Sequence, residues 1–188
     1  MIAPAPTRSI PAPSMSDWVR LGRALRSRFV LRRCADVGLA PRVEGRVWIH
    51  DGGSVYVGDR VRFCAGAAPI ELHAFPGAEI RIGSDVCIEG GTSIEAHRSV
   101  CIGDGAVIGG FCKIIDNHLH LVRGDRHQRP VSLPVVLEPK VVLGRRVIVL
   151  PGAHLNGGTV VAAGTLVRRP RSEPRAGPGR APLPPSRA

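Results

Sequence analysis

Two histidines and an aspartate lie close together in the segment Ile114-Ile-Asp-Asn-His-Leu-His120. Neutral imidazole accepts a proton near pH 7, so His118 and His120 both have the chemistry of a general base. A nearby carboxylate such as Asp116 could fix the tautomer of the ring and stabilise the imidazolium that forms. Exposed loop histidines without a catalytic role are the alternative interpretation. The elements that surround this segment must decide between the two.

A repeat of six residues lies on both sides of the segment. Aliphatic residues recur at Leu137, Leu143, Val149, Leu155, Val161 and Val167. The same spacing links Ile82, Ile88 and Ile94, and then Ile102, Ile108 and Ile114. Because an α-helix repeats near 3.6 residues, this period excludes a helix.

Each hexapeptide is expected to form one short strand and one turn, so that three of them complete a triangular coil of about 18 residues. Stacked coils would pair their strands at about 4.8 Å, with the aliphatic residues inside. The composition agrees, because 44% of the residues are hydrophobic but only 4% are aromatic, which suits a narrow interior. The sequence therefore predicts an all-β fold, a left-handed parallel β-helix.

The ends of the chain differ from the repeat. Residues 1–15 are rich in Pro and Ala and are predicted to be disordered, as is the Pro- and Arg-rich tail 170–188. Residues 16–34 predict an amphipathic helix, with the β-helix domain following over 43–169. The apolar face of this helix carries Trp18, Leu21, Leu25 and Phe29. We expect this face to cover one end of the core, with an anionic membrane as the alternative partner.

The net charge of +11 is concentrated at the two ends. Residues 1–33 hold seven arginines and residues 168–188 hold six, while the middle of the chain is neutral. This pattern argues against a nucleic-acid-binding domain and leaves weak peripheral membrane contact through the basic ends. The sequence contains no transmembrane run and no secretory signal, and its five cysteines form no CxxC pair. We therefore expect a cytoplasmic protein with reduced thiols.

The stretch from Pro134 to Gly152, followed by residues 160–167, keeps the hexapeptide register without a gap. It is similar to the patterns P-V-x-I-G-D-x-V-W-I-G-x-x-V-x-I-L-P-G and V-V-G-A-G-S-V-V. These patterns are typical of the hexapeptide-repeat acyltransferases, in particular the maltose and galactoside O-acetyltransferase-like branch. That branch includes enzymes that acetylate surface polysaccharides. The resemblance covers residues 45–169.

This resemblance implies an acetyl-CoA-dependent O-acetyltransferase that acts on a hydroxyl of a sugar or glycan precursor, assembled as a homotrimer and without a metal. By the register of the family motif I-x-D-x-D-x-H, His120 matches the catalytic histidine and Asp116 the first carboxylate. His118 stands at the second acidic position and is a close competitor. The positions implied for acetyl-CoA binding are Arg145, Ala163, Gly164, Arg168 and Arg169.

Three departures from the family pattern concern the substrate side. Val142 stands where the family has a tryptophan that forms one wall of the site. Glu89 stands where many members have an asparagine, and an ionised carboxylate would repel an oxyanion that an amide can stabilise. Glu138-Pro139 replaces Gly-Asp of the I-G-D turn.

Two other functions remain open on the same fold. One is a zinc enzyme like the carbonic-anhydrase-like hexapeptide proteins, which use three histidines, two of them spaced H-x-x-x-x-H. This chain offers His118-x-His120 and the isolated His73 and His97. The other is a non-catalytic scaffold that binds polyanions through its basic ends. A metal assay and a test of coenzyme A binding would separate these functions from acetyl transfer.

Overall fold

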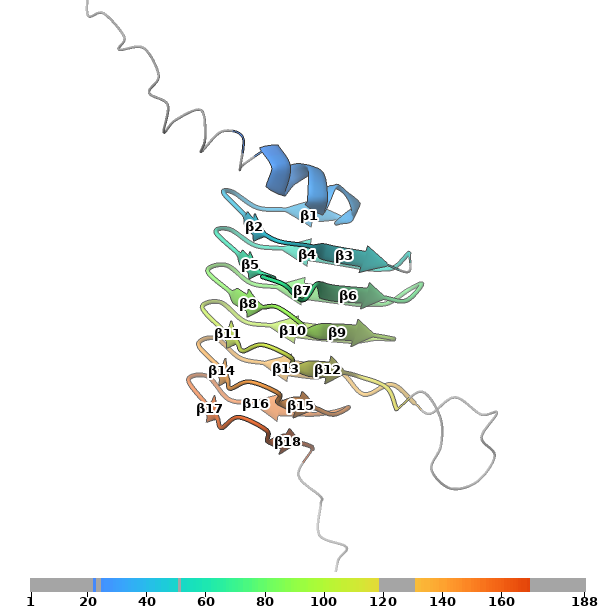
Figure 1. The fold of residues 1–188 in the computed structure, drawn as a ribbon. Coiled ribbons are helices and arrows are strands. Elements are labelled where there is room, and N and C mark those ends of the chain that lie inside the picture. Colours follow the sequence, from blue (N-terminus) through green and yellow to red (C-terminus); the bar gives the residue numbers. More distant parts are fainter. Residues whose placement is uncertain (1–21, 23–24, 51, 119–130, 170–188) are drawn as a thin grey trace, which may run out of the picture.

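The computed structural model describes residues 22, 25–50, 52–118 and 131–169. In this part the chain winds into a stack of triangular coils, a parallel β-helix with a short helical segment at its N-terminal end (Figure 1). Each coil contributes one strand to each of three parallel sheets, which we call A, B and C. The all-β fold predicted from the repeat is therefore confirmed.

The three sheets contain six strands each. Sheet A consists of β1 (Asp36–Val37), β4 (Ser54–Val57), β7 (Glu79–Ile82), β10 (Ser99–Ile102), β13 (Val135–Leu137) and β16 (His154–Leu155). Sheet B consists of β2 (Arg42–Glu44), β5 (Arg62–Cys64), β8 (Cys87–Glu89), β11 (Val107–Ile108), β14 (Val142–Leu143) and β17 (Val160–Val161). Sheet C consists of β3 (Val47–His50), β6 (Ile70–Ala74), β9 (Ser93–Ala96), β12 (Lys113–Ile115), β15 (Ile148–Val149) and β18 (Leu166–Val167).

The six-residue aliphatic positions point into the stack and lie above one another in neighbouring coils. Leu137 pairs with Leu155 in sheet A, and Leu143 pairs with Val161 in sheet B. Because the interior is narrow, Val, Ile and Leu fill it, and Phe63 is the one aromatic side chain in the described residues that is fully buried. The repeat begins earlier than residue 43, since β1 at Asp36 already pairs with β4.

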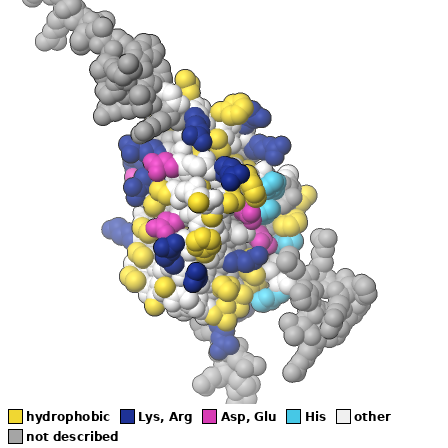
Figure 2. Space-filling model, in the orientation of Figure 1, with side chains coloured by type: hydrophobic (Ala, Val, Ile, Leu, Met, Phe, Trp, Pro, Cys, Tyr) yellow, Lys and Arg dark blue, Asp and Glu magenta, His cyan; other side chains and the backbone are white. Residues whose placement is uncertain are grey.

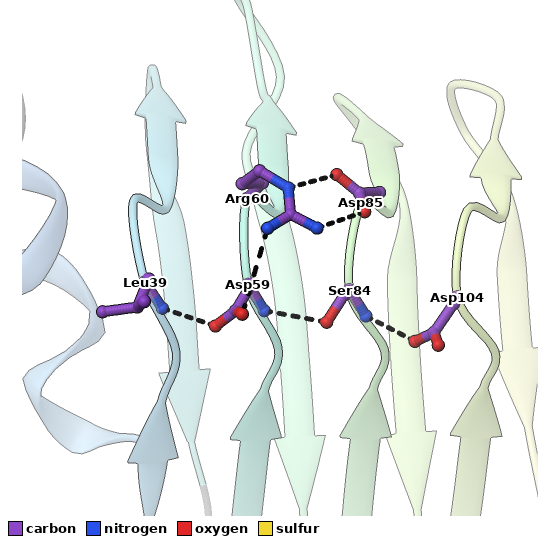
Figure 3. A network of polar contacts seen from close by, with 6 residues as sticks. All are labelled: Leu39, Asp59, Arg60, Ser84, Asp85 and Asp104. Atoms are coloured by element: carbon purple, nitrogen blue, oxygen red, sulfur yellow. Dashed lines mark hydrogen bonds and ion pairs between the residues drawn. The ribbon is translucent and has the colours of Figure 1, made fainter.

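A ladder of side-chain hydrogen bonds runs along the corner between sheets A and B (Figure 3). The backbone N–H of Leu39 donates to Asp59 Oδ1 at 2.7 Å, that of Asp59 to Ser84 Oγ at 3.1 Å, and that of Ser84 to Asp104 Oδ1 at 2.7 Å. Each side chain thus satisfies a turn N–H of the preceding coil. The next coil carries Pro139 at this corner, which has no N–H and no polar side chain, so the ladder ends there.

The N-terminal segment caps the stack differently from the sequence prediction. Residues 25–30 are helical and continue into the 3₁₀ turn η1 (Leu31–Arg33). The residues buried here are Leu31 and Ser27, whose Oγ accepts a hydrogen bond of 3.0 Å from Val43 N–H. Leu25 and Phe29 are instead 62% and 65% exposed, so the expectation that they cover the core is wrong.

Other predictions for the ends of the chain fall partly outside the described residues. These include Trp18 and Leu21, the segment 1–15 and the tail 170–188. All five cysteines are free thiols in the structure. No helix within the described ranges is long and apolar enough to cross a membrane.

Candidate active site

The solenoid is interrupted at the corner between sheets C and A, where β12 ends at Ile115 and β13 resumes at Val135. Two hydrogen bonds close the base of this insertion. Asn117 Nδ2 donates to Ser132 Oγ at 2.8 Å, and the N–H of Leu133 donates to the carbonyl of Asp116 at 2.8 Å. The segment Asp116–His118 is thereby fixed to the last rung before the insertion and to the first residues after it.

Asp116 is fully buried and binds the backbone of the coil beneath it. Its Oδ1 accepts a hydrogen bond from the N–H of His97 at 2.7 Å, and its Oδ2 accepts from Arg98 and Ser99 at 2.6 and 2.8 Å. Charge-assisted bonds of this length are among the stronger ones in proteins. The carboxylate thus holds the preceding corner in shape. Its predicted contact with a catalytic histidine stays a prediction.

Of the two candidate bases, His118 belongs to the described residues and His120 does not. His118 is exposed, directly follows the buried Asn117, and makes no hydrogen bond or ion pair within the described part of the chain. His120 lies outside the described residues. The choice between the two histidines therefore rests on the family register and on the experiments below.

A third histidine lies at this corner, His97, which the sequence offers only as an isolated residue for a zinc site. His97 stacks on Phe75 with ring centroids 3.8 Å apart, and its buried Nε2 has no hydrogen-bond partner among the described residues. The signal was available, because aligning Ile94 with Ile114 puts His97 directly beneath Asn117. In Figure 2 histidine side chains gather on the flank that carries this corner, beside acidic residues.

The corner between sheets B and C holds a second group of candidates, Glu89 and Arg145. Glu89 is exposed at the end of β8, and its Oε2 accepts a hydrogen bond of 2.9 Å from the N–H of Gly110 in the next coil. A Cβ built on Gly110 would lie 3.4 Å from Glu89 Oε2 and 3.6 Å from Arg145 Nη2. The two side chains therefore converge over Gly110, at distances from this Cβ position that correspond to ordinary van der Waals contact.

Ala163 and Gly164 lie one coil further along the same corner. Both are exposed, and the N–H of Gly164 donates to the carbonyl of Arg145 at 2.8 Å. Val142 lies on the outer face of sheet B, half-buried between Val107 and Val160 in the neighbouring strands. The surface here consists of Val107, Val142 and Val160, where the family pattern has an aromatic side chain.

Arg168 and Arg169 lie elsewhere, after β18 and beside the base of the insertion. A Cβ built on Gly152 would be 3.3 Å from Arg169 Cδ and 3.3 Å from the Leu133 side chain. The residues predicted to bind acetyl-CoA are therefore divided between two edges of sheet C. Arg145, Ala163 and Gly164 lie on the B–C edge, and Arg168 and Arg169 on the C–A edge with His118.

Polar side chains also line the outer face of sheet C between these edges. His50 stacks on His73 with centroids 5.0 Å apart, and Lys113 Nζ lies 2.8 Å from Glu95 Oε1. Within the described residues no group of three or more His, Cys, Asp or Glu side chains is arranged to hold a metal ion. We call His50, His73, Glu95 and Lys113 the row on sheet C.

Known structures and sequences resemble this chain over most of its length. The fold matches that of AntD, an N-acyltransferase from Bacillus cereus solved with dTDP and coenzyme A, with a TM-score of 0.57, 18% identity and coverage of 83% of this chain and 80% of that one. A hexapeptide-repeat acetyltransferase from Vibrio cholerae, solved with acetyl coenzyme A, gives a TM-score of 0.49 at 16% identity, covering 82% and 79%. No family model matches the sequence.

The sequence relationship is more specific. The chain is 31% identical over 168 residues to WbbJ of Escherichia coli K12, which is named as a candidate lipopolysaccharide biosynthesis O-acetyl transferase. The match covers 82% of this chain and 80% of WbbJ. The chain therefore belongs to the hexapeptide-repeat acyltransferases, as its sequence predicted, and is an enzyme of the acyl-transferring class.

Proposed function

We propose that the protein transfers an acetyl group from acetyl-CoA to a hydroxyl of a sugar or glycan precursor in polysaccharide biosynthesis. The observation that carries this proposal is the match to WbbJ over four-fifths of both chains. Support comes from the interruption of the solenoid that follows Asp116–His118, and from Leu133 at its base, which lies with Arg169 next to Gly152. Acetyl-CoA is available in the cytoplasm, which is the compartment we expect.

In the proposed reaction His120 is the general base, with His118 as the alternative. Its neutral imidazole accepts the proton of the sugar hydroxyl as that oxygen attacks the thioester carbonyl. The carbon–sulfur bond then breaks, and the imidazolium returns the proton to the departing thiolate of coenzyme A. Asp116 contributes by holding the corner at which this segment leaves the solenoid, through its three backbone hydrogen bonds.

The donor is proposed to bind along the edges that carry Arg145, Ala163, Gly164, Arg168 and Arg169. Guanidinium groups pair well with the phosphates of a nucleotide. The exposed backbone of Gly164, where φ is +73°, leaves room for the pantetheine arm to approach closely. Because these residues occupy two different edges of sheet C, we propose that a groove between two copies brings them together.

A closed threefold homo-oligomer would form such a groove three times. We propose that a second copy covers exposed apolar side chains in the C-terminal half of the stack. Val160 is 73% exposed, Leu166 55%, Phe111 51% and Ile148 42%. Apolar surface of this kind is what subunit interfaces bury. The homotrimer is thus part of the proposal.

The acceptor side is proposed to use Glu89 and the row on sheet C. A carboxylate repels an oxyanion and donates no hydrogen bond to it, so Glu89, whose Oε2 accepts the N–H of Gly110, is unsuited to stabilising the oxyanion. We assign it instead to hydrogen bonds from acceptor hydroxyls, next to the open surface at Val142. Oxyanion stabilisation then falls to backbone N–H groups.

A coupled assay tests the proposal. Purified protein is incubated with acetyl-CoA and a panel of sugar and glycan acceptors, and both the free thiol of coenzyme A and the acetylated product are measured by mass spectrometry. Acceptor-dependent thiol release with an O-acetyl product supports the function. Binding of acetyl-CoA without transfer to any hydroxyl in the panel, together with transfer to an amine, would replace it with N-acetylation.

A further inference from the structure

The N-terminal cap presents an apolar surface that no described part of the chain covers. Leu25 and Phe29 are four residues apart and share one face of the helical segment. Ser27 and Leu31, which face the opposite way, are buried against the first coil. The cap is therefore attached through one face and exposes the other, which is apolar at its centre.

Arginines flank this exposed apolar face on both sides. Arg26, Arg28 and Arg32 are all exposed, and the Arg32 guanidinium lies 4.1 Å above the centre of the Phe29 ring. No acidic residue occurs in the helical segment or in η1. The next apolar side chain at this end is Leu39, 67% exposed, which extends toward the helix in Figure 3. The exposed side of the helical segment and of η1 is thus both cationic and apolar.

We propose that this cap binds the surface of an anionic lipid bilayer, with Phe29 and Leu25 in the interface and the arginines at the headgroups. An apolar strip bordered by cations is the pattern of helices that lie in a membrane interface. A second copy of this chain fits poorly, because pairing two such faces would bring like charges together. Nucleic acid would engage the arginines but would leave Leu25 without an apolar partner.

This orientation has a functional consequence that does not depend on the choice of base. The axis of the solenoid would stand away from the bilayer, with β1 near the lipid and β18 far from it. Sheet C would extend from the membrane toward the insertion. This consequence rests on the proposed function: an acceptor anchored in lipid would approach the insertion along the length of the solenoid.

Vesicle flotation of the full chain tests the proposal. Wild type is mixed with vesicles of phosphatidylcholine alone or of phosphatidylcholine with phosphatidylglycerol. The test variant is Phe29→Asp, and the matched control is Val131→Asp, which removes an apolar side chain that is 79% exposed and adds the same charge at the base of the insertion. A third variant, Arg28→Gln with Arg32→Gln, tests the charge contribution.

We expect wild type and Val131→Asp to bind the anionic vesicles and not the neutral ones. Phe29→Asp should weaken this binding at least about tenfold, and each arginine removed should weaken it about fivefold. Binding should also fall as salt is raised. Circular dichroism checks that the variants remain folded. No binding by wild type, equal binding by Phe29→Asp, or a change of oligomeric state in Phe29→Asp would each overturn the proposal, the last by identifying a protein interface.

Discussion

Asp116 Oδ1 accepts a hydrogen bond of 2.7 Å from the backbone N–H of His97, which joins the residue before the insertion to the corner of the coil beneath it. With the bonds to Arg98 and Ser99, one carboxylate satisfies three consecutive backbone donors. A residue predicted for catalysis thus has a structural task that the sequence motif did not show.

Asp116→Ala should therefore destabilise the fold before it affects any chemistry. An orphaned N–H costs about 1–3 kcal/mol when it is fully buried, and the three donors here are only partly buried, so we expect a total loss of about 1–3 kcal/mol in the free energy of unfolding. Chemical denaturation measures this loss. The exposed His118→Ala serves as the control and should change stability little. If Asp116→Ala unfolds like wild type, the three hydrogen bonds do not hold this corner.

Replacing Arg168 and Arg169 by Ala should raise KM for acetyl-CoA with a smaller effect on kcat, because the predicted contact is with phosphates and is not at the reacting carbonyl. The weakening should be larger at low salt than at high salt. Arg60→Ala is the matched control, since Arg60 is paired with Asp85 on the A–B corner at 2.6 Å. An unchanged KM in the double variant would assign both arginines to the solvated tail.

The Glu138–His154 pair predicts a pH dependence of stability. His154 Nε2 lies 2.7 Å from Glu138 Oε1, and this hydrogen bond, with that from Gly157 N–H, lowers the pKa of Glu138. A carboxyl whose pKa is depressed in the folded state contributes stability above its unfolded pKa, and this contribution is lost as pH falls through the folded value. Glu138→Gln should therefore lower Tm near neutral pH and match wild type in strong acid. If Glu138→Gln and wild type have the same Tm near neutral pH, this pair does not contribute to stability.

Cys34 and Cys64 should resist alkylation in the folded protein. Burial raises the pKa of Cys34 to about 12, and burial together with the nearby Cys87 raises that of Cys64 to about 11. Because only the thiolate reacts, iodoacetamide at pH 8 should modify both residues far more slowly in the native protein than after denaturation. Peptide mass spectrometry over a time course gives the two rates. Rapid native labelling of Cys34 would show that it is not buried as in this structure.

The fold could be predicted from the sequence because each coil packs only against the coils directly above and below it. Each inward position, such as Leu143 or Val149, needs only its neighbours in the adjacent coils, so a period of six specifies the contact. The N-terminal helix was different. The periodicity puts Leu25 and Phe29 on one face but does not determine which face of the helix contacts the core. In the structure Ser27 and Leu31 are buried against the first coil.

The candidate site was only partly predictable. The motif located Asp116 and His118 at an interruption of the repeat, which the structure also shows. It could not show that Asp116 binds the His97 corner, because this contact depends on the register between coils that have an irregular length. The same limit applies to Glu89, whose partner Gly110 lies one coil further on. Periodicity fixes the inside of such a solenoid and leaves the outward side chains undetermined.

The most direct test of the account is kcat for acetyl transfer in His120→Ala and His118→Ala, measured with an acceptor that wild type uses. Removing a positioned general base costs about 10²–10⁴-fold in rate. We expect His120→Ala to lose this much while retaining its oligomeric state and its affinity for acetyl-CoA, and His118→Ala to lose far less. The reverse order would make His118 the base. Full activity in both variants would contradict the proposed mechanism.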